Sequence, residues 1–368
     1  MHILFAGGGT AGHINPALAI AGYIKEKHPD YKISYIGTAT KLEATLVPQA
    51  GYDFYTIDVA GFQRKISLKN IARNVVAVKK MFSSSVEARK LLKMLKPDIV
   101  VGTGGYVSGP VLREAVKLGI KTAIHEQNAY PGITTKALAK KVDRVMLAIP
   151  GTEEKVECKN PPIITGNPVR EELLKTTREE ARAKLGLDNR PLILSFGGSL
   201  GAGPINRAAV GLILSHNGSG NYYHIHATGK LGYDSTLKSI NERCQNLSKE
   251  INVREYIDDM NICMAAADLV ISRAGAITLS EISALGKPSI LIPSPYVAEN
   301  HQYHNAMSLK RVGAAEVIEE KDLTEEILID TVNAILKDEK RLEEMKSGAK
   351  KAAILDSGER IYEVLSSL

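Results

Sequence analysis

Cysteine is scarce in this sequence, and the few thiols that it has exclude a scaffold held by disulfides. The 368 residues contain three cysteines, Cys158, Cys244 and Cys263. They lie too far apart to form a CxxC metal motif or a disulfide framework. We therefore expect three free thiols, small and at least half-buried, in a reducing compartment.

Long apolar runs are absent as well. No stretch approaches the roughly 20 apolar residues that a membrane-spanning helix needs, and the first expected strand follows Met1 without room for a signal peptide. Apolar residues make up 44% of the chain and charged residues 24%, which is ordinary for a globular protein with buried cores. The sequence predicts a cytosolic protein, and its length suggests about two domains.

Several signatures of nucleotide and metal chemistry are missing. The sequence has no Asp-x-Asp, no HExxH and no Walker Gly-Lys-Ser/Thr motif. Gly7-x-Gly9-x-x-Gly12 matches the dinucleotide fingerprint, but no acidic residue follows the second expected strand until Glu43, which disfavours an NAD-dependent dehydrogenase. A sugar transferase without Asp-x-Asp must stabilise its leaving diphosphate with helix N-termini and arginine.

An internal repeat is the most informative feature that is present. Residues 5–19 align without gaps on residues 196–210, with seven identical positions at an offset of 191. Each copy follows an apolar run and leads into a helical pattern, and a glycine-rich turn of this kind brings backbone N–H groups close to an anion. The copies differ at His13, which is matched by Pro204. The repeat predicts two nucleotide-binding folds in tandem whose loops have diverged.

Alternating apolar runs and helical patterns predict the α/β class, with parallel sheets covered by helices on both faces. The expected strands are 2–6, 32–37, 54–59, 98–102, 121–125, 144–149, 191–196, 222–227, 251–257, 269–272, 288–292 and 315–318. Turn residues cluster at 160–168, so we place the domain boundary there, with domains at 1–163 and 164–355. The charged helical stretch 339–368 either ends the second domain or returns from about residue 356 to the first.

Further polar clusters follow expected strands, at the sheet edge where parallel α/β proteins bind ligands. In the first domain these are the glycine-rich run 102–109 and His125-Glu-Gln-Asn128. In the second, Gly275 opens a helix suited to a diphosphate, and Glu281 lies one turn into it, where a carboxylate suits a ribose diol. Residues 299–305 are rich in amide and imidazole groups that suit sugar hydroxyls. We expect a ligand site built from these edges.

Positive charge is concentrated in one stretch. The chain carries a net +6, and residues 61–97 hold ten basic residues and one acid, Glu87. Apolar residues alternate with these bases, a pattern that suits an anionic membrane surface or, alternatively, a solvated helix that packs its apolar side on the sheet. No nucleic-acid-binding motif accompanies the stretch, so we do not expect nucleic acid as a partner.

Taken together, these residues resemble the GT-B glycosyltransferases of family 28, along essentially the whole chain. Ala11 stands where the family often has glycine, and His301 where some members have glutamine. The matching motifs are Gly7-Gly-Gly-Thr-Ala-Gly-His13, Gly102-Thr-Gly-Gly-Tyr-Val-Ser-Gly-Pro110, His125-Glu-Gln-Asn128, Gly166-Asn-Pro-Val-Arg170, Gly197-Gly-Ser199, Tyr256-Ile-Asp-Asp-Met260, Arg273-Ala-Gly-Ala-Ile-Thr-Leu-Ser-Glu281 and Gln302-Tyr-His-Asn305.

The resemblance implies two Rossmann-like domains facing a deep cleft, and an inverting hexosyltransferase of peptidoglycan synthesis, a process tied to cell shape and division. Such enzymes transfer N-acetylglucosamine from UDP-N-acetylglucosamine to the C4 hydroxyl of undecaprenyl-diphospho-N-acetylmuramoyl-pentapeptide (lipid I), which gives lipid II. It further implies peripheral attachment to the cytoplasmic face of an anionic membrane, proteins of cell-wall synthesis as partners, and no metal or other cofactor.

Carried over residue by residue, the resemblance places the donor in the second domain. The implied donor residues are Arg170, Ser199, Ile257 (through its backbone), Ala276, Ile277, Thr278, Leu279, Ser280, Glu281, Gln302 and Asn305, with Thr10 and Asn128 reaching the sugar from the first domain. The implied acceptor-diphosphate residues are Ala11, Gly12, Gly104, Gly105 and Tyr106.

The reaction needs a base for the acceptor hydroxyl. His13 is the first candidate, because the second copy of the repeat replaces it with proline, and His125 and Glu126 are its rivals. Other readings of the same fold are a glycosyltransferase with a soluble acceptor, a UDP-N-acetylglucosamine 2-epimerase, or a regulator that binds a nucleotide sugar without turnover.

Overall fold

The computed structural model describes residues 1–59 and 68–368, and within the helix at 68–95 it leaves out the side chains at 68–79, 81 and 82. The chain divides into two compact units. Unit 1 comprises Met1–Pro168 and Asp356–Leu368, and unit 2 comprises Val169–Leu355. The chain therefore passes from unit 1 to unit 2 between Pro168 and Val169, a few residues beyond the predicted boundary after residue 163.

Unit 1 is built on a sheet that has seven parallel strands among the described residues, in the order β3-β2-β1-β4-β5-β6-β7. β1, an interior strand, pairs on one side with β2 and on the other with β4. The strands are β1 (His2–Gly7), β2 (Lys32–Gly37), β3 (Asp53–Thr56), β4 (Ile99–Gly104), β5 (Lys121–Glu126), β6 (Arg144–Leu147) and β7 (Ile163–Ile164).

Apolar residues fill both faces of the unit 1 sheet, because successive strand residues point to opposite sides. Leu4 and Ala6 belong to one core cluster, and Ile3 and Phe5 belong to another. The helices of this unit are α1 (Ala11–Lys27), α2 (Glu43–Gln49), α3 (Leu68–Leu95), α4 (Gly105–Lys117), α5 (Ile133–Leu138), the 3-10 turn η1 (Glu153–Lys155) and α15 (Ser357–Ser366).

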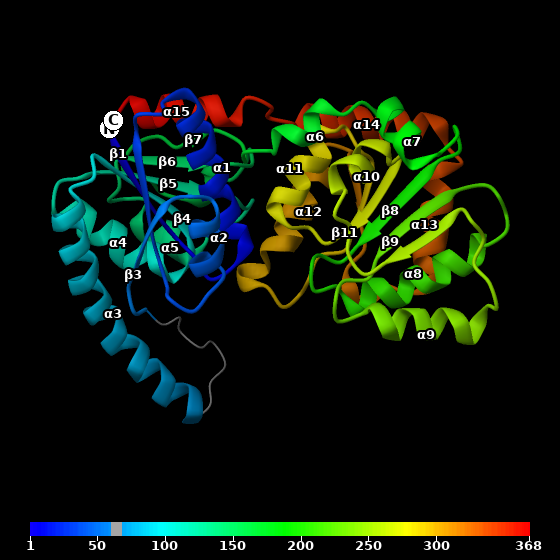
Figure 1. Ribbon diagram of the computed structural model, residues 1–368, viewed down its shortest axis with the longest axis horizontal. Coiled ribbons are helices and arrows are strands. Elements are labelled where there is room, and N and C mark those ends of the chain that lie inside the picture. The colour runs from blue at the N-terminus through cyan, green and yellow to red at the C-terminus, as the bar shows by residue number, and fades with distance from the viewer. Residues whose placement is uncertain (60–67) are drawn as a thin grey trace. The chain divides into compact units, whose positions relative to one another are not determined.

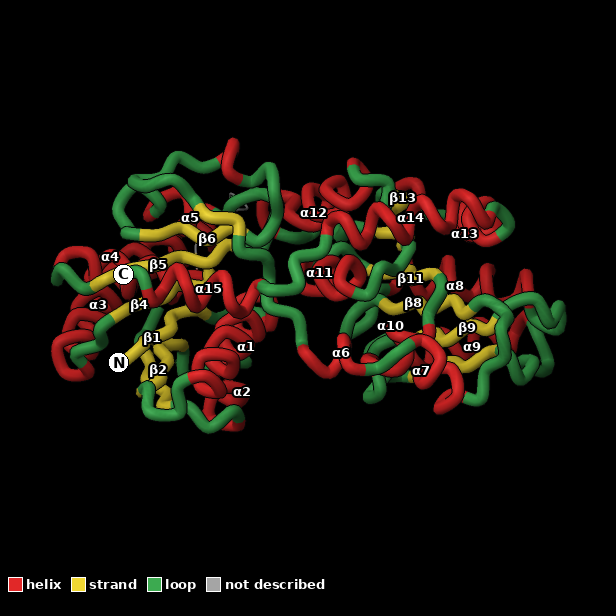
Figure 2. Tube along the Cα trace, turned by 90° about the horizontal axis from the view of Figure 1, so that it is seen from above, coloured by secondary structure: helices red, strands yellow, loops and turns green. Residues whose placement is uncertain are grey.

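Unit 2 repeats this plan. Its described sheet has six parallel strands in the order β10-β9-β8-β11-β12-β13, and helices lie on both sides of the strands (Figure 2). The strands are β8 (Leu192–Phe196), β9 (Tyr223–Ala227), β10 (Ile251–Arg254), β11 (Leu269–Ser272), β12 (Ser289–Leu291) and β13 (Ala315–Val317). β8 has the place in its sheet that β1 has in the other, so the sequence repeat is a repeat of structure.

The helical segments of unit 2 surround this sheet. They are α6 (Glu171–Lys175), α7 (Arg178–Leu185), α8 (Gly203–His216), α9 (Tyr233–Arg243), α10 (Met260–Ala266), α11 (Ala276–Ala284), η2 (Ala298–Asn300), α12 (His301–Arg311), η3 (Glu320–Asp322), α13 (Glu325–Leu336) and α14 (Glu339–Ala352). All twelve expected strands are confirmed to within a few residues. β7, α6 and α7 were missed, the first because it has two residues beside a pair of prolines.

The last helix, α15, belongs to unit 1 and lies beside α1 (Figure 1). Ile361, Val364 and Leu365 join the core cluster that contains Ile20. At the polar margin, the ring of Tyr362 stacks on His28 with the centroids 5.2 Å apart. The chain thus completes its first unit with its final residues.

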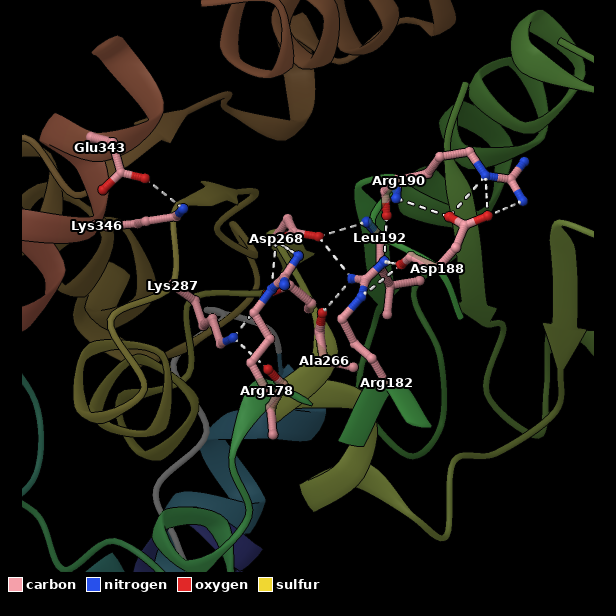
Figure 3. A network of polar contacts seen from close by, with 12 residues as sticks. Arg178, Arg182, Asp188, Arg190, Leu192, Ala266, Asp268, Lys287, Glu343 and Lys346 are labelled. Atoms are coloured by element: carbon pink, nitrogen blue, oxygen red, sulfur yellow. Dashed lines mark hydrogen bonds and ion pairs between the residues drawn. The ribbon is translucent and has the colours of Figure 1, made fainter. Parts of the chain in front are cut away.

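A buried polar network holds the end of the unit 2 sheet at which β8 and β11 begin (Figure 3). Asp268, immediately before β11, accepts two hydrogen bonds from Arg178 at 3.0 and 2.8 Å and one from Arg182 at 3.0 Å. It also accepts from the backbone N–H of Leu192 at 2.9 Å. Nearby, the ammonium group of Lys287 donates to two carbonyls at the end of α10. This network lies where the strands begin, whereas the predicted ligand residues lie beyond the ends of the strands. We therefore assign it a structural role.

Candidate functional site

The first glycine loop joins β1 to α1 and is held by a buried carboxylate. Glu43 accepts hydrogen bonds from the backbone N–H of Gly9 at 3.0 Å and from the N–H and hydroxyl of Thr38 at 3.1 and 2.7 Å. Glu43 is fully buried. Glu43, which lies too far beyond the end of the second strand to match the ribose-binding acid of a dinucleotide fold, therefore fixes the shape of the first glycine loop. The loop leaves Thr10, Ala11 and Gly12 exposed at the start of α1, where a helix N-terminus favours an anion.

His13 lies in the first turn of α1 and is half-buried. Its Nδ1 is 3.1 Å from the carbonyl oxygen of Thr103 and 3.4 Å from Oε1 of Gln127. Both neighbours accept hydrogen bonds, so the proton of the neutral ring is on Nδ1 and the lone pair is on Nε2. Among the described residues, no hydrogen-bond partner is found for Nε2, which suits this nitrogen to take a proton from a ligand.

His125 has both ring nitrogens engaged within unit 1. Nε2 lies 2.9 Å from the carbonyl oxygen of Gly166, and Nδ1 lies 3.1 Å from the amide nitrogen of Gln127. The side chain is buried, and burial lowers its pKa, against the smaller raising effect of the Gly166 hydrogen bond. A neutral imidazole fixed at both nitrogens is suited to holding its neighbours in place.

Glu126 is buried as well, and its carboxylate closes the loop after β5. One oxygen accepts from the N–H and the side-chain amide of Asn128, at 3.1 and 3.0 Å. The other accepts from the N–H of Gly132 at 2.9 Å and the hydroxyl of Thr135 at 2.6 Å. Both oxygens are therefore occupied by groups of the same loop, and this arrangement also fixes the position of Asn128.

Two of the glycines at the end of β4 are required by close contacts inside unit 1. Gly104 has φ +110°, and a Cβ there would lie 2.5 Å from Nδ1 of His13. Gly105 has φ +77°, and its Cβ would lie 2.2 Å from the carbonyl oxygen of Gly8. Tyr106, 51% exposed, extends beside Gly9. The predicted acceptor-diphosphate residues thus lie together at the exposed end of β1 and β4.

In unit 2, Arg170 and Glu281 form an ion pair. The guanidinium of Arg170 donates to Oε1 of Glu281 from Nε at 3.0 Å and from Nη2 at 2.9 Å. Glu281 is buried, and burial raises its pKa, while Arg170 opposes the rise. No described residue hydrogen-bonds the other carboxylate oxygen, which leaves it for a ligand. Two predicted donor residues from different motifs are therefore in direct contact.

The remaining predicted donor residues of unit 2 lie around the ends of its strands. Ser199 is exposed in the loop between β8 and α8, and Ile257 is buried after β10. Gly275 is the N-cap of α11, so Ala276, Ile277, Thr278, Leu279 and Ser280 form its first turns. Asn305 is fully buried and donates to the carbonyl of Ala274 at 3.2 Å, which supports the turn that begins α11.

A pocket of about 440 Å³ opens at the same edge of unit 2. Gln302 lies in its wall and accepts from the N–H of Ser294 at 2.9 Å. Arg273 also lines it, donating to the carbonyl of Ile292 at 3.1 Å and pairing with Glu320. The other lining residues are Gly197, Gly201, Ala202, Gly203, Pro204, Ser294, Tyr296 and Glu320. Arg273 was not among the predicted site residues. The expectation that arginine stabilises the diphosphate named no position for it, and the resemblance assigned only Arg170.

Three further sequence predictions concern metal sites, free thiols and the two unit 1 residues expected to contact the donor sugar. Within the described part of the chain, no group of three or more His, Cys, Asp or Glu side chains is arranged to hold a metal ion. The three cysteines are free, two of them half-buried and one buried. That Thr10 and Asn128 reach the donor sugar depends on both units together and stays a prediction.

The basic stretch 61–97 corresponds largely to α3. Arg64 and Lys65 lie outside the described residues, as do the side chains of Lys69, Arg73 and Lys79. In the described part, Ala88 and Leu92 pack in the core, while Lys90 and Lys93 are exposed. Within residues 1–59 and 68–368, no helix is both long and apolar enough to cross a membrane.

Comparison with known proteins gives matches to both halves of the chain. The glycosyltransferase family 28 N-terminal domain matches residues 3–147, and the glycosyltransferase family 28 C-terminal domain matches residues 192–361. A protein of Acetivibrio thermocellus is 50% identical over 100% of this chain and 98% of its own length, and one of Ruminiclostridium cellulolyticum is 44% identical over the full length of both. Both are named UDP-N-acetylglucosamine--N-acetylmuramyl-(pentapeptide) pyrophosphoryl-undecaprenol N-acetylglucosamine transferase.

Solved structures show the same arrangement of elements. The crystal structure of Acinetobacter baumannii MurG matches with a TM-score of 0.79 at 28% identity, covering 100% of this chain and 99% of that one. A UDP-GlcNAc 2-epimerase from Neisseria meningitidis, bound to UDP-GlcNAc, matches with a TM-score of 0.65 at 15% identity, covering 100% of both chains. At that identity the second likeness is one of fold alone.

Proposed function

This chain belongs to glycosyltransferase family 28, and we propose that it transfers N-acetylglucosamine from UDP-N-acetylglucosamine to the C4 hydroxyl of undecaprenyl-diphospho-N-acetylmuramoyl-pentapeptide with inversion. The observation that carries the proposal is the 50% identity, over the whole chain, to a relative named for this reaction. The chain is thus a hexosyltransferase of peptidoglycan synthesis, and its product is lipid II.

The reaction is a single displacement in which the acceptor oxygen attacks C1 of the sugar and UDP leaves from the opposite face. The attacking hydroxyl must lose its proton as the bond forms. His13 is the best-suited base, because hydrogen bonding at Nδ1 leaves Nε2 to receive that proton. His125 and Glu126 have their polar atoms engaged in holding the neighbouring loops. Their role is to fix the loops that surround His13 and Asn128.

We assign donor binding to unit 2. The oxygen of Glu281 that Arg170 does not occupy is available to the ribose hydroxyls. The backbone of Ile257 pairs with uracil, and Ser199 with the start of α11 holds the diphosphate, where a helix N-terminus supplies N–H groups and a favourable dipole. Gln302 in the pocket wall faces the sugar.

We propose that neither substrate needs a metal ion. For the donor, the positive charge at the diphosphate comes from the start of α11 and from arginine, and Arg273 in the pocket wall is a further source. For the acceptor, the exposed start of α1 at Ala11 and Gly12 holds the diphosphate, with Gly104, Gly105 and Tyr106 beside it. Helix N-termini and guanidinium groups are established binding groups for phosphates.

We also propose that the enzyme works on the cytoplasmic face of the membrane as a peripheral protein, alongside other proteins of cell-wall synthesis. Its acceptor is lipid-linked, so the active site has to approach the bilayer. The described part of α3 exposes Lys90 and Lys93 together with the apolar side chains of Val86 and Met94, which are 56% and 61% exposed. Basic and apolar side chains on one helix favour an anionic lipid surface.

The test of the function is transfer of labelled N-acetylglucosamine from the UDP donor to a lipid I analogue, with the product identified by mass. Labelled disaccharide on the lipid is the expected result. Formation of UDP-N-acetylmannosamine without an acceptor would establish a 2-epimerase instead. Tight UDP-N-acetylglucosamine binding without turnover of either kind would leave a regulator, and transfer only to water-soluble sugars would leave a different transferase.

A further inference from the structure

A series of hydrogen bonds within unit 1 connects His13, through Gln127 and His125, to the backbone of Gly166. Nδ1 of His13 faces Oε1 of Gln127 at 3.4 Å, and the amide nitrogen of Gln127 donates to Nδ1 of His125 at 3.1 Å. Nε2 of His125 then lies 2.9 Å from the carbonyl oxygen of Gly166. Asn167 adds a second link, because its side-chain amide donates to the backbone carbonyl of Gln127 at 3.2 Å. Gln127 is therefore the central residue of this network.

The network gives the amide of Gln127 a single useful orientation. Its nitrogen donates both to Nδ1 of His125 and to the His125 carbonyl, at 2.8 Å. Its oxygen is consequently turned toward His13. Gln127 is 2% exposed and His125 is 1% exposed, so water does not compete for these bonds, and a buried amide in a satisfied network has little freedom.

This orientation matters because His13 needs two things to act as a base: the proton on Nδ1 and a fixed ring plane. The Thr103 carbonyl, at 3.1 Å, selects the Nδ1–H form. A single acceptor still allows the ring to swing about that contact, whereas a second acceptor at a different position limits the rotation. Small errors in the placement of a reacting group reduce turnover steeply.

We propose that Gln127 is a positioning residue for His13: it holds the imidazole with Nε2 toward the acceptor hydroxyl and anchors it to the Gly166-Asn167 segment at the end of unit 1. The inference rests on the transfer reaction proposed above. The residues at the far end of the network, Gly166 and Asn167, directly precede Pro168, after which the chain enters unit 2. The base and the exit of the chain from unit 1 thus share one rigid support.

Two substitutions separate positioning from packing. Gln127→Met keeps the length of the side chain but removes both the acceptor and the donor. Its kcat should fall about 10-fold to 100-fold, with the KM for UDP-N-acetylglucosamine within about two-fold of the parent, because the donor residues of unit 2 are untouched. Gln127→Glu keeps an acceptor toward His13 and adds a negative charge, so it should retain more turnover than the methionine variant.

The glutamate variant has a second readout that does not depend on activity. A carboxylate beside Nδ1 favours the protonated ring, so the titration midpoint of His13, followed by NMR with ¹⁵N-labelled histidine, should move to higher pH. His125 faces the same position and will report alongside it. The nearby carboxylates of Glu43 and Glu126 are common to both proteins. Gln49→Glu and Gln49→Met, at an exposed position of α2 in the same unit, are the matched controls.

The outcomes are distinct. An unmoved His13 titration in Gln127→Glu, together with parental kcat in Gln127→Met, would overturn the proposal. If the methionine variant does not fold, the titration of the glutamate variant decides alone. If the parent protein shows no transfer to the lipid I analogue, the proposed function fails, while the NMR titration still tests the contact between Gln127 and His13.

Discussion

The imidazole of His13 lies over the backbone of Gly104, so closely that a Cβ on Gly104 would be 2.5 Å from Nδ1. Gly104 also has φ +110°, a conformation that side chains rarely adopt. Residue 104 is therefore glycine in part because a side chain there would clash with the imidazole ring of His13. The loop after β4 was expected to be glycine-rich for a ligand, and part of the reason is this contact with the candidate base.

Replacing His13 should abolish most turnover and leave donor binding intact. His13→Ala removes the base, so we expect kcat to fall about 10²-fold to 10⁴-fold, while calorimetry gives an unchanged affinity for UDP, whose residues lie in unit 2. Glu126→Gln should instead lower the melting temperature, since its four contacts hold a loop. A mild loss at His13 and a severe one in a fully folded Glu126→Gln protein would transfer the role to the carboxylate.

Glu281→Ala should weaken UDP binding by about 1–3 kcal/mol, through loss of charged hydrogen bonds to the ribose. The variant also leaves Arg170 without its partner, so the melting temperature should be measured in parallel. Titration calorimetry with UDP is the direct test, and Glu242→Ala, at an exposed position of α9, is the control. Unchanged UDP affinity in a folded Glu281→Ala protein would remove this residue from the donor site.

Transfer should proceed without divalent cations. The expected diphosphate ligands are helix N-termini and arginines, which need no metal to bridge them to phosphate. Rates measured after exhaustive EDTA treatment should match those in magnesium. Loss of activity in EDTA that magnesium restores would show that an ion takes part.

Charge reversal on α3 should reduce membrane binding more than catalysis. Lys90→Glu combined with Lys93→Glu alters two exposed bases, and attraction to anionic vesicles should weaken, as it should for the parent when salt is raised, because the screening length is about 8 Å at physiological ionic strength. Vesicle sedimentation measures the binding, and a short-chain soluble acceptor measures turnover. An equal loss of both would indicate that these positions serve folding.

Acid should destabilise unit 2 through its buried histidines. Ser195 bridges His224 and His226 at 2.7 Å each, and His216 lies 3.2 Å from His224. Burial lowers the pKa of His226 to about 4. Between pH 6.5 and 4 the unfolded chain therefore binds more protons than the folded one, and the free energy of unfolding falls as the pH falls.

The slope from one such histidine approaches about 1.4 kcal/mol per pH unit, and it vanishes above pH 6.5, where both states are neutral. Urea denaturation at a series of pH values measures this dependence. In His226→Gln, the loss on acidification should be smaller than in the parent. The same acid dependence in both proteins would show that His226 is not its source.

Most of the architecture could be predicted from the sequence because two sequence patterns determine it: the alternation of apolar runs with helical segments, and the internal repeat. Apolar runs alternating with helical segments predicted the parallel sheets, and the copies at Phe5 and Phe196 begin α1 and α8 from the same place in each sheet. The short strand β7 and helix α6 were missed, because two and five residues are too few to establish a period. Tertiary pairing, which a linear pattern does not encode, creates them.

The candidate site was foreseen by residue type more than by role. His125, Glu126 and Gln127 were recognised as a polar cluster, but three adjacent polar residues carry no mark of which one faces a ligand. The structure engages all three in internal hydrogen bonds, and the side-chain oxygen of the third faces His13. Glu43 shows the same limit, because its partner, the Gly9 amide, is 34 residues away along the chain.

The position of α15 has a consequence for how the protein is made. Unit 1 lacks part of its core until Ile361, Val364 and Leu365 have left the ribosome, and until then the surface of α1 that they cover is open to water. Unit 2, which ends at Leu355, is synthesised in full before that moment. The packing of α15 beside α1 closes a loop that contains almost all of the chain between them, and closing so long a loop costs conformational entropy and delays folding. Unit 1 should therefore be the last to complete its core although its strands are synthesised first, and until then its exposed apolar surface is where a chaperone would bind it.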